Sequence, residues 1–220
     1  MENQRREDFI VACSIFNLPN RLRLLYSEFE SEKVLCTSSF GAHSALLLYL
    51  ISVVKPEQKI YFIDTGNHFK ETLEYKEKIT EKLGLNVIDI TASPEVHNFV
   101  TLNETWKTSP EFCCHLKKIK PVDALKKKHA VWMTGLMEWQ SDHRATLNYL
   151  EKRNGILRFN PLLDLSEENF QYWIEQFDLP RNELVKQGYE SIGCTHCTTK
   201  GSKRSGRWKG TEKTECGLHL

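Results

Sequence analysis

The chain has 220 residues, enough for one substantial hydrophobic core but few for two full domains. Its 30 lysines and arginines nearly balance 29 aspartates and glutamates, so a net charge of +1 gives no reason to expect nucleic acid or an anionic membrane as partner. No segment approaches the roughly 20 apolar residues that span a bilayer, and the charged start is unlike a signal peptide. These features predict a cytoplasmic protein, in which seven cysteines favour metal binding or thiol chemistry over disulfides.

Hydrophobic periodicity predicts an alternation of strands and helices. Residues 1–30 carry apolar side chains at helical spacing among charges and predict one or two amphipathic helices. The expected strands are 34–37, 59–63, 86–90 and 130–133, and the helices expected after the first two are 46–54 and 71–83. This order predicts an α/β fold with a mainly parallel sheet and helices on both faces.

Small-residue turns follow three of these strands, at 38–42, 64–66 and 134–135. Ligands of parallel sheets bind beyond the carboxyl ends of the strands, so the turns are expected along one edge. The first turn, Ser38-Ser39-Phe40-Gly41-Ala42, suits phosphate binding through backbone N–H groups, or is an ordinary strand-to-helix turn with a serine cap. It is neither a Walker A sequence nor a dinucleotide fingerprint.

The composition divides the chain into three parts. We expect an N-terminal helical segment at 1–30, an α/β nucleotide-binding domain at 31–188 and a cysteine-containing tail at 189–220. Residues 190–217 are rich in Gly, Ser, Thr, Lys and Cys and have almost no aliphatic side chains, so they cannot form a core of their own. The tail is therefore predicted to be flexible, or ordered by a ligand.

Four cysteines give the strongest inorganic signal, Cys113 and Cys114 in tandem and Cys194 and Cys197 in a Cys-x-x-Cys run. Four thiolates can hold an iron–sulfur cluster or a zinc ion. The third interpretation is that they are buried free cysteines that pack as small hydrophobic residues. Lys118, close to the tandem pair, could balance a negatively charged cluster.

Cys216 lies close to the end of the chain between glycine and polar residues, where we expect it to be exposed. A thiolate is the reactive form of cysteine, and nearby cations lower its pKa; the alternative is an incidental thiol on a frayed end. Arg204 and Arg207 precede it and either bring positive charge to an anionic substrate or belong to a solvated basic run. Cys13 and Cys36 occur in apolar surroundings and are assigned to the core.

Together these motifs resemble the family of adenylylsulfate and phosphoadenylylsulfate reductases, from about Val34 onward. The most specific match is Lys213-Thr214-Glu215-Cys216-Gly217-Leu218-His219, which is similar to the family's catalytic terminus. The turns at 38–42 and 64–66 and the basic run at 204–208 occur in the family's order. The resemblance implies an adenine nucleotide alpha hydrolase-like fold of the PP-loop type, with a flexible C-terminal tail.

The cysteine pattern resembles the members that act on adenylylsulfate. Members that act on the 3′-phosphorylated nucleotide typically lack the tandem pair and the Cys-x-x-Cys run. The resemblance therefore implies one 4Fe-4S cluster on Cys113, Cys114, Cys194 and Cys197 rather than zinc. It also implies reduction of adenylylsulfate to sulfite and AMP in assimilatory sulfate reduction, with thioredoxin or glutaredoxin as electron donor and an S-sulfocysteine at Cys216.

Alternatives to this reading stay open. A phosphoadenylylsulfate reductase or a dual-specific enzyme belongs to the same class, and a non-catalytic zinc-binding module belongs to a different one. The sequence is compatible with a homo-oligomer but does not determine the oligomeric state.

The resemblance assigns substrate binding to the turn residues and to the cations around them. These residues are Ser38, Ser39, Phe40, Gly41, Ala42, Asp64, Thr65, Gly66, Lys118, Arg144, Arg204, Arg207 and His219. The chain departs from the family where Met137 and Glu138 replace two arginines of the turn at 135–141. Arg144, which from the residues alone belongs either to the site or to a helix cap, is then the remaining cation.

Overall fold

One six-stranded sheet organises the chain, with the strand order β3-β2-β1-β4-β6-β5. The computed structural model describes residues 3–213 and 215–218. The strands are β1 (Val34–Ser38), β2 (Lys59–Asp64), β3 (Asn86–Thr91), β4 (Val131–Met133), β5 (Leu150–Arg153) and β6 (Ile156–Phe159). Neighbouring strands are parallel except β5 and β6, which are antiparallel. The predicted mainly parallel sheet is confirmed, and each predicted strand is present to within one residue at either end.

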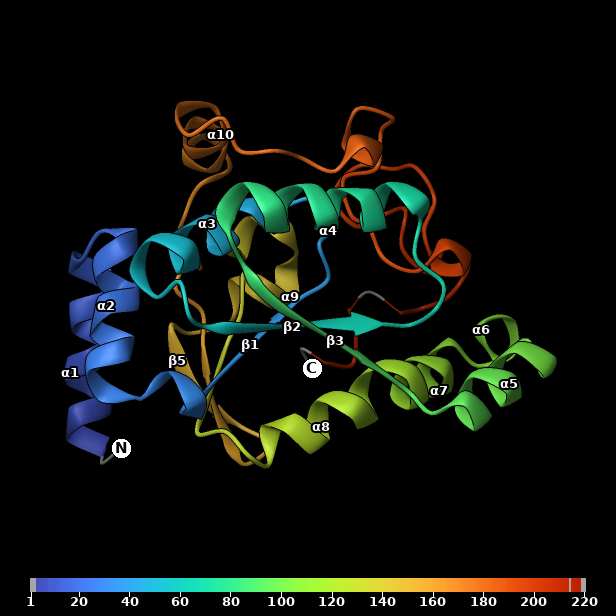
Figure 1. The fold of residues 1–220 in the computed structure, drawn as a ribbon, viewed down its shortest axis with the longest axis horizontal. Helices are drawn as coiled ribbons and strands as arrows, with labels where there is room; N and C mark the ends of the chain where they lie inside the picture. Colours follow the sequence, from blue (N-terminus) through green and yellow to red (C-terminus); the bar gives the residue numbers. More distant parts are fainter. Residues whose placement is uncertain (1–2, 214, 219–220) are drawn as a thin grey trace.

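Helices connect the strands and cover both faces of the sheet (Figure 1). They are α1 (Asn3–Ile15), α2 (Leu18–Glu28), α3 (Ala45–Val54), α4 (Lys70–Leu83), α5 (Pro94–Leu102), α6 (Thr105–Thr108), α7 (Pro110–Cys114), α8 (Lys120–Lys126), α9 (Asp142–Ala145) and α10 (Glu167–Gln176). Shorter turns are η1 (Ser31–Lys33), the π-helical η2 (His115–Ile119), η3 (Glu138–Gln140), η4 (Glu183–Val185) and η5 (Thr195–Cys197). Within the part of the chain that the structure describes, no helix is both long and apolar enough to traverse a bilayer.

Side chains that alternate along the strands pack into two hydrophobic cores, one on each face of the sheet. Val34 and Cys36 of β1 enter the main core with α1, α2, α3, α4 and α10, whereas Leu35 between them enters a second core under α8. Trp132 of β4 and Leu218 of the tail also belong to the second core. The N-terminal helices and the tail therefore pack on the same sheet.

A hairpin at the sheet edge was not predicted from the sequence. β5 and β6 are joined by Asn154 and Gly155, whose φ angles are 47° and 83°. An asparagine-glycine pair is the typical signal for this turn because both positions need positive φ. This signal is present in the sequence, but the flanking strands are too short and too charged to be recognised as strands.

The strand order creates a crevice at the carboxyl ends of the strands. β1 lies between β2 and β4, and the chain winds outward on either side of it, so β1 and β4 form the switch point at which such sheets bind ligands. The tail, orange to red in Figure 1, folds onto this edge. The composition predicts a tail that is flexible or ordered by a ligand, and in the structure its Ile192 and Trp208 are buried.

Candidate active site

A cavity of about 450 Å³ lies at the switch point, between the turns after β1 and β4 and the tail. A volume of this size suits a nucleotide-sized ligand. Most of the residues predicted to bind substrate or to act as nucleophile line it, namely Ser38, Ser39, Gly41, Ala42, Lys118, Arg144, Arg204, Arg207 and Cys216. Residues more than 170 positions apart in the sequence therefore meet around one space.

The turn after β1 is anchored in the core by one buried aromatic side chain. Phe40 has a φ of 46°, its N–H donates to the Ser38 hydroxyl at 3.1 Å, and its ring packs on Phe62. A Cβ on Gly41 would lie 3.4 Å from the backbone oxygen of Ile192, so the tail approaches this turn closely. The Phe40 side chain is fully buried in the main core and does not line the cavity, and substrate binding by Phe40 stays a prediction.

The turn after β2 supports the cysteines and does not line the large cavity. The Asp64 carboxylate accepts the N–H of Gly66 at 2.7 Å, and Gly66 has a φ of 67°. Thr65 is buried, and its hydroxyl lies 3.3 Å from Cys194 Sγ. The structure thus places this turn beside the Cys-x-x-Cys segment, and substrate binding by Asp64, Thr65 and Gly66 stays a prediction.

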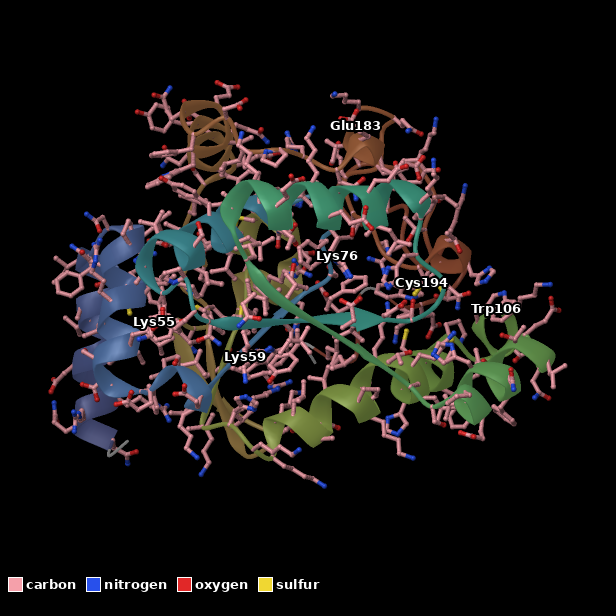
Figure 2. The ribbon with its side chains drawn as sticks, in the orientation of Figure 1. Lys55, Lys59, Lys76, Trp106, Glu183 and Cys194 are labelled. Atoms are coloured by element: carbon pink, nitrogen blue, oxygen red, sulfur yellow. The ribbon has the colours of Figure 1, made fainter. Side chains whose placement is uncertain are left out.

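The four cysteines line a second, small cavity next to the first. Cys113 and Cys114 end α7, while Cys194 directly precedes η5 of the tail and Cys197 is its last residue. Cys194 is labelled in Figure 2 at the same end of the molecule as Trp106 of α6, which lines this cavity too. Among residues 3–213 and 215–218, no three His, Cys, Asp or Glu side chains converge closely enough to hold a single metal ion.

Lys118 lines both cavities and is the cation that the thiols share. Burial acts against its charge, but the neighbouring thiols Cys194, Cys216 and Cys114 raise its pKa above the ordinary value. Burial also acts to raise the pKa of Cys194, yet Lys118 and the Thr65 hydroxyl hold it below the usual range. Positive charge is therefore concentrated between the cysteine cavity and Cys216.

Cys216 is half-buried at the wall of the large cavity, not exposed as expected from its neighbours in sequence. With Cys114 as a free thiol, its hydrogen bond lowers the pKa of Cys216 well below the usual value; burial opposes this shift, and the charges of Lys118 and Arg207 lower the pKa independently of Cys114. Arg207 also stacks over Trp208, with its guanidinium carbon 4.4 Å from the ring centroid. The thiol is thus presented to the cavity among cations, the surroundings that favour a reactive thiolate.

Glu215, the residue before Cys216, is 1% exposed and lies between two arginines. Its carboxylate accepts from the Ser141 hydroxyl at 2.7 Å and from Arg144 Nε at 3.0 Å, and pairs with Arg204 Nη2 at 3.0 Å. Ser141 also caps α9, since its hydroxyl accepts from the backbone N–H of Arg144. The tail is therefore tied to the turn after β4 by a buried ionic network.

A model of the phosphoadenosine phosphosulfate reductase domain matches residues 33–200. The chain is also 37% identical over 213 residues to a Staphylococcus epidermidis protein named adenosine 5′-phosphosulfate reductase, a match that covers 90% of this chain and 85% of that protein. The chain belongs to the phosphoadenosine phosphosulfate reductase family. As a member of this family it is an enzyme, and the resemblance inferred from its motifs is confirmed.

Solved structures share the fold of this phosphoadenosine phosphosulfate reductase family member. A crystal structure of phosphoadenylyl-sulfate reductase from Candida auris in complex with phosphate has a TM-score of 0.77 at 23% identity, covering 90% of this chain and 98% of that chain. An FMN adenylyltransferase of Candida glabrata, solved with FMN and an ATP analogue, has a TM-score of 0.55 at 15% identity and covers 80% and 60%. At these identities the likeness concerns the fold alone, and the expected α/β fold with a mainly parallel sheet is confirmed.

Two residues of this chain stand where the family motif has arginines, and both lie outside the cavity. Met137 is buried in the main core and Glu138 is exposed, and neither lines the cavity. Sequence analysis quoted Glu215 only as part of the terminal motif, without a role, and did not name His43, which lines the cavity. Both were visible as neighbours of predicted residues, but nothing in the sequence indicated their contacts. The predicted His219 lies outside the described residues.

The donor set of the small cavity fits an iron–sulfur cluster. Its four thiols come from two segments, and cysteine thiolates are the ligands that such clusters take. Trp208 lines the same cavity and is 3% exposed, and within the described residues its indole N–H has no hydrogen-bond partner. An unpartnered buried donor on a side chain that lines the cysteine cavity is compatible with a sulfur-rich group there.

Proposed function

We propose that this enzyme reduces adenylylsulfate to sulfite and AMP, with Cys216 as nucleophile and a thioredoxin-type dithiol as electron donor. The observation that carries the proposal is the position of Cys216, which faces a nucleotide-sized cavity among Lys118, Arg204 and Arg207. The 37% identity to a protein named adenosine 5′-phosphosulfate reductase supports this substrate. Membership of an enzyme family argues against the non-catalytic zinc module.

The first half-reaction is an attack by the Cys216 thiolate on the sulfur of the sulfonucleotide. A bond forms between Cys216 Sγ and that sulfur, the bond from sulfur to the bridging phosphate oxygen breaks, and AMP leaves with the electron pair. The sulfur is shielded by negative oxygens, so the thiolate approaches only where cations offset their charge. Lys118 and Arg207 supply positive charge beside the thiol.

The second half-reaction releases sulfite. A thiolate of the donor attacks Cys216 Sγ, sulfite leaves, and a mixed disulfide remains; the donor's second thiol then resolves it, so the dithiol supplies both electrons. Because Cys216 is half-buried, the end of the tail must move outward for the donor to reach it. We therefore propose a closed tail for the first step and an open tail for the second.

Cys113, Cys114, Cys194 and Cys197 would hold the 4Fe-4S cluster. When bound, this cluster would supply fixed charge and cross-link α7 to the tail. The residue that this chain places between the cluster site and the thiol is Lys118, which lines both cavities. Its ammonium group can therefore orient substrate oxygens next to the cysteine ligands without taking part in electron transfer.

The test is sulfite release by the anaerobically purified enzyme with thioredoxin and either sulfonucleotide. We expect sulfite from adenylylsulfate, and weaker competition by the 3′-phosphorylated nucleotide. Equal competition would indicate dual specificity, and preference for the 3′-phosphorylated nucleotide would overturn the substrate assignment. Iron and inorganic sulfide are expected in equal amounts, whereas zinc without sulfide would overturn the cluster assignment.

A further inference from the structure

Among the described residues 211–213 and 215–216, the charged side chains that form ion pairs are Lys213 and Glu215. Before Cys216, the side chain of Lys213 forms one ion pair, 3.4 Å from Glu111. That carboxylate is exposed, with 76% of its side chain accessible, and pairs of this kind contribute little. Glu212 is exposed and forms no ion pair that the described residues show. The Lys213 ammonium also lies 5.4 Å from the Trp208 ring centroid. Of the charged side chains just before Cys216, Glu215 therefore forms the shorter and more deeply buried ion pairs, both at 3.0 Å.

Glu215 is fully enclosed and has charged donors on two sides. Ser141 and Arg144 reach it from the turn after β4 and from α9, and Arg204 reaches it from the tail itself. Charge-assisted hydrogen bonds are the strong ones, and removing one partner of a buried ion pair leaves the other charges uncompensated. The carboxylate thus fixes the position of the backbone that carries the next residue, Cys216.

The same two arginines line the large cavity. The Glu215 carboxylate therefore neutralises cations that an anionic substrate would otherwise contact directly. A residue that only stabilised the fold would have no reason to draw on charges in the substrate cavity. Glu215 is instead placed to hold the nucleophile in position, at the cost of a lower affinity for the nucleotide.

We propose that Glu215 is a positioning residue, an anchor that holds the tail closed through Arg144 and Arg204 and so aims Cys216 at the substrate. Breaking the anchor is expected to free Cys216 without weakening nucleotide binding. The part of the inference that concerns catalysis rests on the proposed function, whereas the part that concerns closure of the tail does not.

The first experiment measures closure alone. The holoenzyme is treated with iodoacetamide without nucleotide, and alkylation of the Cys216 peptide is followed by mass spectrometry. Glu215→Gln is expected to speed alkylation at least about tenfold, because loss of one partner of a buried ion pair shifts a local opening equilibrium by more than that factor. Glu215→Asp keeps the charge and is expected to restore most of the protection. Glu212→Gln, on the same segment, is the matched control and should behave as wild type.

Arg204→Met removes the same ion pair from the other side, so the test does not depend on whether Glu215→Gln folds. It too is expected to speed alkylation of Cys216. Wild-type alkylation rates in every folded variant of Glu215 and Arg204 would overturn the anchor. This result is independent of what the enzyme reduces.

The second experiment separates positioning from binding. In single turnover with adenylylsulfate and no reductant, Glu215→Gln is expected to form the Cys216 adduct about 100-fold more slowly, the effect of a misplaced reacting group. Its nucleotide dissociation constant is expected to be unchanged or lower, because Arg144 and Arg204 are released. Equal loss of affinity and rate would overturn the inference. If wild type forms no adduct, the proposed function fails while the alkylation contrast still decides the anchor.

Discussion

Lys118 is the side chain that joins the two halves of the site. It lines the nucleotide-sized cavity and the cysteine cavity, and the thiols around it favour its charged form. The sequence placed it near Cys113 and Cys114, so a role beside the cluster could be predicted. Its proximity to Cys216, almost a hundred residues later, depends on the folded tail and could be inferred only from the family resemblance.

Replacing Lys118 with alanine is expected to slow adduct formation at Cys216 by about 100-fold, because one preorganised positive group at the reacting sulfur is lost. Lys120→Ala, an exposed lysine at the start of α8, is the matched control and should react at the wild-type rate. Rapid mixing with adenylylsulfate and quenched-flow mass spectrometry measure both rates. Equal rates in the two variants would contradict the role of Lys118.

His43 gives the cavity a titratable group that sequence analysis did not single out. Its ring packs edge-on against Trp139 and Phe170 at centroid distances of 5.1 and 5.4 Å. Burial, with Arg181 and Arg144 nearby, lowers the pKa of His43 to about 4. The folded protein therefore keeps this imidazole neutral at pH values where the unfolded chain would bind a proton.

This difference predicts a loss of stability in mild acid. The unfolded chain binds a proton near pH 6.5 and the folded protein does so only near pH 4, so the free energy of unfolding falls as pH decreases through this window. Between pH 7 and 5, wild type is expected to lose about 2 kcal/mol more than His43→Gln. Urea unfolding at both pH values measures the difference, and identical losses would show that His43 does not contribute.

The hairpin of β5 and β6 shows why one element escaped prediction. Its strands have four residues each, and only the Asn154-Gly155 pair between them carries a strong local signal. β1 and β2, by contrast, are apolar runs buried on both faces, and such runs are visible in sequence. At this hairpin the turn residues therefore indicated the structure, whereas the hydrophobicity of the strands did not.

Gly155→Ala is expected to lower the free energy of unfolding by about 1 kcal/mol, since a side chain disfavours positive φ. A Cβ at this position would meet no atom within 4 Å, so the cost comes from the backbone alone. Asn154→Gly is the matched control, because glycine adopts the φ of 47° without strain. Urea denaturation compares them, and a stability of Gly155→Ala equal to wild type would contradict the assignment of the turn.

Across the molecule, the mainly parallel sheet and the edge where its turns gather could be predicted, because the alternation of strands and helices and the small-residue turns are visible locally in the sequence. The state of the tail could not. The tail has too few aliphatic residues to form a core of its own, yet its Trp208 and Leu218 are buried. The Glu215 carboxylate accepts hydrogen bonds from residues 71 and 74 positions earlier in the chain. Division of the chain at 30 and 188 stays a prediction, although α1 and α2 share the main core with the sheet.

The central claim is that Cys216 itself attacks the substrate sulfur. Anaerobic enzyme incubated with adenylylsulfate and no reductant, then digested and mapped by mass spectrometry, tests it directly. The account predicts one SO₃ group on the peptide that contains Cys216, removed by a dithiol as sulfite and absent from Cys216→Ser. An adduct on another cysteine, or sulfite release by Cys216→Ser at the wild-type rate, would contradict it.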